Sequence, residues 1–167
     1  FTQLDEAFDL ADRIPVPPGR YDVQRLTIFA GSSPSRRIGG GLAVRTSDEW
    51  DGRLDLLDLR TRVSIGKHLT TGVGWTVSRA DLPGGAFTAH VLGFRASWAF
   101  STRLVTRAFI QYNSLDQKWI TNLRLRFIHR PGSDLYVVFN DEQGEEGEPG
   151  RLVSRGFAVK GTWLVRF

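Results

Sequence analysis

Cysteine and methionine are both absent from this chain of 167 residues. Without cysteine there can be no disulfide, thiolate metal site or cysteine nucleophile. The absence of cysteine does not indicate the cellular compartment, because many exported proteins also lack it. No stretch approaches the roughly 18 consecutive apolar residues that a transmembrane helix requires. The polar opening shows no targeting segment, and without an initiator methionine we expect a processed or partial product, so missing targeting signals carry no weight.

Lysine is scarce. It occurs only at Lys67, Lys118 and Lys160, so the 22 basic residues are almost all arginine, and the net charge is +4. The planar guanidinium group suits ion pairs and anion contacts in confined places. The arginines are spread through strand-like segments and form neither a run nor a helix face, so nucleic acid is not expected as a partner.

Alternation of apolar and polar residues dominates from Tyr21 onward and predicts an all-β fold, an antiparallel meander of about nine strands. Residues 1–20 are expected to form an outer loop or linker, with a short helical turn around Leu4–Ala11 that the prolines at 15–18 stop. Residues 21–167 would form the C-terminal β-barrel strands of a larger barrel. The strands are expected at 21–31, 38–46, 53–66, 69–79, 86–100, 103–113, 119–129, 134–140 and 154–167.

Each clear strand has one apolar and one polar face, and alternation alone leaves open which face is inside. A soluble β-barrel that binds an apolar small ligand would bury the apolar face, whereas a membrane barrel turns it toward lipid. The connections favour the membrane. Residues 46–52, 79–86 and 140–153 give long connections, 113–118 a middle one, and 67–68, 100–103 and 130–133 short ones. Only the connection at 32–37 blurs this contrast. Outer-membrane barrels show this asymmetry, with short turns on the periplasmic side.

The stretch from Gln111 to Glu142, QYNSLDQKWITNLRLRFIHRPGSDLYVVFNDE, carries a more specific signal. It resembles the C-terminal β-barrel of an uncharacterised bacterial outer-membrane family that usually carries an N-terminal carbohydrate-binding family 9-like domain. IPVPPGRYDV at 14–23 and DLPGGAF at 81–87 fit the same pattern. The resemblance implies a barrel in the bacterial outer membrane. It assigns no sugar-binding residue, because the carbohydrate-binding-like domain is not in this chain.

The end of the chain, KGTWLVRF, places Trp163, Val165 and Phe167 on one face of the last expected strand. A terminal phenylalanine on an alternating strand resembles the assembly signal of such barrels, so we expect the barrel-assembly machinery as a partner. Single-chain bacterial barrels have an even number of strands. Nine expected strands therefore predict that upstream strands or another chain complete the barrel.

Outer-membrane lipid is the other expected partner, with Leu59, Val63, Leu123, Leu125 and Val159 facing it. The opposite face would line the lumen, and its expected residues are Arg45, Asp58, Arg60, Arg62, Arg95, Arg107, Gln111, Asn122, Arg124, Arg126 and Arg166. These arginines could attract anionic or polar solutes into a water-filled pore, or pair with carboxylates and hold the barrel's shape. The second role is favoured, because charge ladders are common in barrel interiors.

Several aromatic residues fall near expected strand ends, where membrane barrels carry interfacial girdles. They are Tyr21, Trp98, Phe100, Tyr112, Trp119, Phe127, Tyr136 and Trp163. No catalytic residue, metal site or cofactor is expected. His68, His90 and His129 lie on separate elements without metal-ligand spacing, and no serine stands in a nucleophile motif. The function expected from the sequence is therefore that of a non-catalytic pore, anchor or scaffold.

Overall fold

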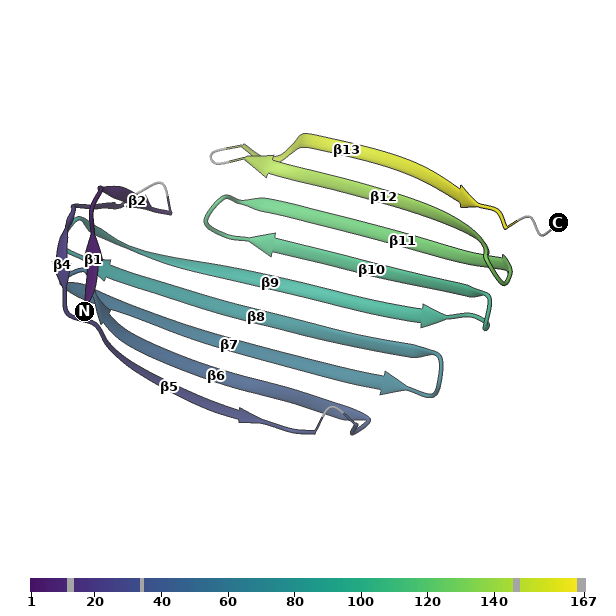
Figure 1. The fold of residues 1–167 in the computed structure, drawn as a ribbon, viewed down its shortest axis with the longest axis horizontal. Coiled ribbons are helices and arrows are strands. Elements are labelled where there is room, and N and C mark those ends of the chain that lie inside the picture. Colours follow the sequence, from purple (N-terminus) through teal and green to yellow (C-terminus); the bar gives the residue numbers. More distant parts are fainter. Residues whose placement is uncertain (12–13, 34, 146–147, 165–167) are drawn as a thin grey trace.

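Nine antiparallel strands form one sheet, in which every strand pairs with its neighbours in sequence (Figure 1). The computed structural model describes residues 1–11, 14–33, 35–145 and 148–164, and all its regular elements are strands. The sheet comprises β5 (Gln24–Gly31), β6 (Ile38–Glu49), β7 (Gly52–Ile65), β8 (Leu69–Leu82), β9 (Gly85–Ala99), β10 (Leu104–Asn113), β11 (Lys118–Arg130), β12 (Ser133–Glu145) and β13 (Glu148–Thr162). The expected all-β meander of nine strands is confirmed.

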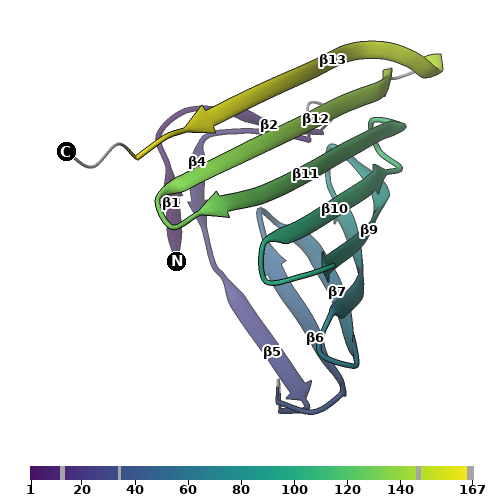
Figure 2. The same ribbon diagram turned by 90° about the vertical axis from the view of Figure 1, so that its right-hand side faces the viewer.

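The sheet is open in the described residues, with β5 and β13 as its two edges. Figure 2 shows it curled into a trough, with the N-terminal strands on the inner side. The prediction that these strands do not close a barrel by themselves is therefore confirmed. Each edge presents a row of unpaired backbone N–H and C=O groups, which is a template for another strand.

Four short strands precede the sheet: β1 (Thr2–Leu4), β2 (Phe8–Leu10), β3 (Ile14–Val16) and β4 (Gly19–Tyr21). We call them the cap. β1 pairs with β4 and β2 with β3. The helical turn expected around Leu4–Ala11 is wrong, because Phe8–Leu10 finds a ladder partner in Ile14–Val16 and both strands then contribute apolar side chains to a common core.

The cap packs against one end of the sheet. Ile14, Val16 and Tyr21 form a buried cluster with Leu82 of β8, and the Tyr21 hydroxyl donates a hydrogen bond to the Pro17 carbonyl oxygen at 2.8 Å. Leu54 and Phe87 are partly buried and pack against this cluster. Ala80 lies between them in the ladder as the cross-strand partner of both, and it is also buried. We call this the cap end of the sheet and the opposite one, where β13 ends, the distal end (Figure 1).

The long connections expected at the cap end are wrong. Strands run through most of those residues, so that Trp50–Asp51 and Pro83–Gly84 alone join β6 to β7 and β8 to β9. The physical reason is cross-strand pairing of opposite charges, which stabilises a ladder even where the residue types are typical of turns. The directly opposed pairs are Asp48 with Arg53, Arg53 with Asp81, Asp55 with Arg79, and Asp141 with Arg155.

The tight turn between β6 and β7 places two non-glycine residues in the left-handed region, Trp50 at φ 53° and Asp51 at φ 58°. A two-residue turn of this hand matches the twist of the flanking strands. The Trp50 ring packs edge-on against Phe8 of the cap, with the ring centroids 5.2 Å apart. Side-chain packing thus compensates part of the backbone strain at this turn.

In the described part of the chain, no helix is long and apolar enough to cross a membrane.

Candidate functional site: the arginine-lined face

One face of the sheet is polar and rich in arginine. Directly opposed residues on antiparallel strands project to the same side, so the register assigns each side chain to a face. Ten of the eleven residues expected in the lumen share this face, which we call the polar face. They are Arg45, Asp58, Arg60, Arg62, Arg95, Arg107, Gln111, Asn122, Arg124 and Arg126. Arg166 lies outside the described residues.

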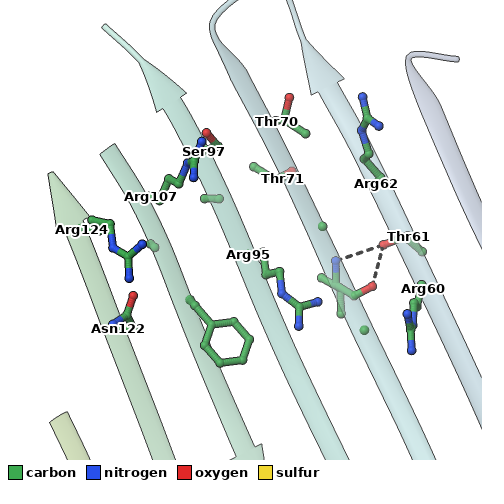
Figure 3. A pocket seen from close by; sticks show the side chains of 16 residues that line it. Arg60, Thr61, Arg62, Thr70, Thr71, Arg95, Ser97, Arg107, Asn122 and Arg124 are labelled. Atoms are coloured by element: carbon green, nitrogen blue, oxygen red, sulfur yellow. Dashed lines mark hydrogen bonds between the residues drawn. The ribbon is translucent and has the colours of Figure 1, made fainter. Parts of the chain in front are cut away.

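The polar face is hollowed. A cavity of about 550 Å³ lies over β7 to β11 and is lined by Arg62, Arg95, Arg107 and Arg124 among others (Figure 3). A second hollow, of about 380 Å³, lies beside it over β5 to β7. The first has the size of an ordinary small-molecule site. The sheet therefore curls toward its charged side, and the arginines project into the trough.

Three of the arginines on this face are held by carboxylates: Arg25, which pairs with Glu49, Arg60 and Arg126. Arg60 Nε lies 2.7 Å from Asp58 Oδ1, and the Thr76 hydroxyl donates to the other oxygen of the same carboxylate at 3.0 Å. Arg126 Nη2 lies 2.6 Å from Asp134 Oδ2, with its guanidinium group 5.4 Å from the ring centroid of Tyr136. The Arg126–Asp134 pair joins neighbouring strands, as the favoured interpretation of the sequence expects, whereas Arg60 and Asp58 lie on one strand. The role of such pairs in holding a barrel's shape stays a prediction.

The arginines around the larger cavity differ. Arg62, Arg95, Arg107 and Arg124 form no ion pair with any residue in the described ranges. Arg107 lies directly opposite Arg124 in the ladder. Arg95 lies opposite Phe109, and its Cζ is 4.9 Å from the centroid of that ring. This part of the face is a concentration of positive charge, which the favoured pairing role does not explain.

The sequence reasoning missed polar and aromatic neighbours that shape the site. Thr70 and Ser97 continue the row of Arg107 and Arg124 across β8 and β9, and Phe109 supports Arg95. Extending the alternation phase to the expected strands at 69–79 and 103–113 would have placed Thr70 and Phe109 on this face. Among the described residues, no group of three or more histidine, aspartate or glutamate side chains is arranged to hold a metal ion.

The opposite, outer face carries an apolar band. Leu59, Val63, Leu123, Leu125 and Val159, the residues expected to face lipid, all lie on it. Leu59 is 39% exposed, Leu123 40% and Val159 56%, so large apolar side chains lie uncovered. A contiguous apolar surface of this kind marks an interaction with lipid or protein.

The band has a constant height along the strands. Its outward positions carry no charged side chain from Leu57 to Ile65 on β7 and from Leu69 to Val77 on β8. The corresponding stretches run from His90 to Trp98 on β9, from Leu104 to Tyr112 on β10 and from Trp119 to Phe127 on β11. This is about nine residues per strand, the length with which a tilted strand crosses the hydrocarbon core. On β7 and β8, the opposed pairs Asp55 with Arg79 and Arg53 with Asp81 follow directly beyond the band at the cap end.

Aromatic side chains border the band. Towards the cap end, Trp75 of β8, Leu92 of β9, Tyr112 of β10 and Trp119 of β11 are paired in one row across the strands. The Tyr112 and Trp119 rings pack with centroids 4.8 Å apart. Towards the distal end Trp98 stacks on Phe100 at 4.4 Å, and the Phe127 side chain is outward. Trp98, Tyr112, Trp119 and Phe127 lie at the ends of the band, and with Phe100 they occupy the positions expected of a girdle; Trp75 was not among the expected residues.

Two expected girdle residues lie elsewhere. Tyr21 is buried in the core between the cap and the sheet, since residues 19–21 form a cap strand and do not begin β5. Tyr136 lies on the polar face, where its hydroxyl donates to Asp134 at 3.3 Å. Trp163 follows β13, and its ring stacks on His129 with centroids 5.4 Å apart. The other members of the proposed assembly signal, Val165 and Phe167, lie outside the described residues.

Comparisons with protein-family models, with curated proteins and with solved structures found no match for this chain. The resemblance of the Gln111–Glu142 stretch to an outer-membrane family therefore stays a prediction.

Proposed function

We propose that this chain is a segment of an outer-membrane β-barrel that acts as a non-catalytic pore, anchor or scaffold. Its outer face contacts lipid, and its polar face lines a water-filled interior. The observation that carries the proposal is the uncharged outer band, which keeps the same length on five consecutive strands. Aromatic rings and then, at the cap end, cross-strand pairs of oppositely charged residues border it, in the order in which a bilayer changes from hydrocarbon to interface to water.

The two faces also favour a membrane barrel over a soluble one. A soluble barrel that binds an apolar ligand would turn its apolar side chains toward the trough. Here arginines line the trough together with Thr70, Ser97 and Asn122, whereas leucine, valine and tryptophan side chains lie exposed on the outside. This arrangement suits a lipid exterior and a wet interior.

The open edges make partners necessary under this proposal. Within lipid, an unpaired backbone N–H or C=O group costs several kcal/mol, so a spanning sheet must close. We propose that upstream strands or another chain pair with β5 and β13, and that the barrel-assembly machinery inserts the protein into the bacterial outer membrane. The cap end then faces outward and the distal end faces the periplasm, as the expected position of Phe167 requires.

Nitroxide labels test the proposal on both faces. Single cysteines are introduced at Leu59, Leu123 and Val159 on the outer face, and at Ser97 and Asn122 on the polar face as controls. In liposomes, we expect outer labels to be relaxed by oxygen dissolved in lipid, and polar-face labels by a water-soluble nickel chelate. Outer labels that are shielded from both reagents would mean a protein-packed face and would contradict the membrane proposal.

A further inference from the structure

Repulsion between guanidinium groups is built into the polar face. Arg107 and Arg124 are direct cross-strand partners, and like charges in this position destabilise a sheet. Arg95 lies on the strand next to that of Arg107 and is displaced by two residues along the ladder, because it pairs with Phe109 and Arg107 pairs with Ser97. No acidic residue in the described ranges forms an ion pair with any of these three. The arrangement has a physical cost that an oxyanion between the guanidinium groups would remove.

Small side chains keep space open around the arginines. Gly72 of β8 lies between two arginines in the ladder: it pairs with Arg62 of β7 on one side and with Arg95 of β9 on the other. Gly74 and Gly93 oppose each other in the next row, and a Cβ added at Gly74 would meet nothing within 4 Å. The floor of the cavity is therefore bare backbone, over which the long arginine side chains can reach a bound group.

The cavity also offers hydrogen-bond donors that suit an oxyanion, and it restricts the orientation of the Arg95 guanidinium group. Phe109 lies under the Arg95 guanidinium group, which limits the directions in which that side chain can point. Ser97 and Thr70 add hydroxyl groups in the row of the arginine pair. Figure 3 shows Arg107 and Arg124 on adjacent strands, with Arg95 between them and Arg62. Guanidinium forks bind phosphate and carboxylate oxygens through two parallel hydrogen bonds, which a lysine cannot do.

We propose that this cavity binds solutes that carry oxyanion groups, of which phosphate is the best match to several guanidinium forks. The volume of about 550 Å³ accommodates a small organic phosphate as well as an inorganic one. The inference deepens the proposed function, and it rests on that function in treating the polar face as a water-filled interior. The arginine cluster then selects anionic solutes within the barrel.

The test is a calorimetric titration of inorganic pyrophosphate into the full-length, detergent-solubilised protein at low ionic strength. We expect saturable binding that weakens as salt is added, because salt screens the attraction. In the variant R107Q/R124Q the affinity should fall about tenfold or more, as expected when charge-assisted hydrogen bonds are lost. R107K/R124K should be intermediate, because it retains the charge without the planar fork.

The matched control is R53Q/R79Q, which removes the same charge from the outer face beyond the apolar band. Its affinity for pyrophosphate should change by less than about twofold, since Arg53 and Arg79 do not line the cavity and cannot donate hydrogen bonds to a group bound there. Equal losses in the two double variants, or no saturable binding by the wild type, would overturn the inference. If R107Q/R124Q does not fold, R62Q gives the same test with a single charge removed.

Failure of the inference and failure of the proposed function give different results. A protein that stays monodisperse without detergent contradicts the membrane proposal, whatever it binds. A protein that requires detergent but does not distinguish R107Q/R124Q from R53Q/R79Q contradicts only the oxyanion site.

Discussion

The sharpest test of the two faces uses one strand. Leu123 and Ile120 lie three residues apart on β11 and project to opposite sides, with Leu123 40% exposed and Ile120 36% exposed. Replacing each by arginine makes the same chemical change on the two faces. If the protein were soluble, the similar exposure of the two side chains predicts that each substitution changes the free energy of unfolding by a similar, small amount, within about 0.5 kcal/mol.

In a bilayer the two substitutions differ. Leu123 is the middle outward position between Trp119 and Phe127, so it lies near the midplane, where arginine costs about 2–4 kcal/mol. Ile120→Arg instead points into the trough opposite Glu142, which can pair with it. We expect L123R to lower the free energy of unfolding by about 2–4 kcal/mol and I120R to change it by less than about 0.5 kcal/mol.

The measurement is reversible denaturant unfolding in lipid vesicles, followed by tryptophan fluorescence, with both variants at one lipid composition. The difference between the two variants is the decisive quantity, because it cancels general effects of adding a charge. Equal losses, or a larger loss for I120R, would refute the assignment of the faces to lipid and water.

Three further outcomes follow from particular contacts. G52A should lower the free energy of unfolding by about 1–3 kcal/mol, since its Cβ would clash with the Asp81 carbonyl oxygen, whereas the Cβ of G74A meets open space and this variant should lose less; thermal unfolding compares them. Y21F removes the hydrogen bond inside the cap and should cost about 1 kcal/mol. Limited proteolysis should then cleave the cap faster, while the sheet stays protected. Deleting Phe167 should lower the amount of protein that reaches the outer membrane and leave the heat-modifiability of the inserted fraction unchanged. Unchanged membrane levels would remove the assembly-signal hypothesis.

The sequence predicted the sheet well because period-two alternation is a local property. Leu57, Leu59, Val63 and Ile65 alternate with charged residues, so the strand and both its faces follow from neighbouring positions alone. The same phase placed Arg62, Arg95, Arg107 and Arg124 together, although they come from four strands. In a meander each strand pairs with the next one, so a correct phase on each strand is enough to assemble the face.

The ends of the strands and the cap needed information that no local pattern carries. Asp48 and Asp81 have low strand propensity, and they extend β6 and β8 beyond the expected ends because Arg53 lies opposite both of them across the ladder. Tyr21 has the spacing of a girdle aromatic, but Ile14 and Val16 draw it into a core that forms only after the first strands fold back. That Arg107 and Arg124 have no carboxylate partner among the described residues is likewise a property of the register and of side-chain geometry.

The two open edges constrain what can complete this sheet. Direction alternates along an antiparallel sheet of nine strands, so β5 and β13 point the same way, as Figure 1 shows. Two copies related by rotation about the barrel axis would place β13 of one beside β5 of the other as parallel neighbours at each seam. An antiparallel closure requires an odd number of added strands between the edges. Rings built only from this nine-stranded sheet are thereby excluded as all-antiparallel barrels, and the completing segment must differ from the sheet that it completes.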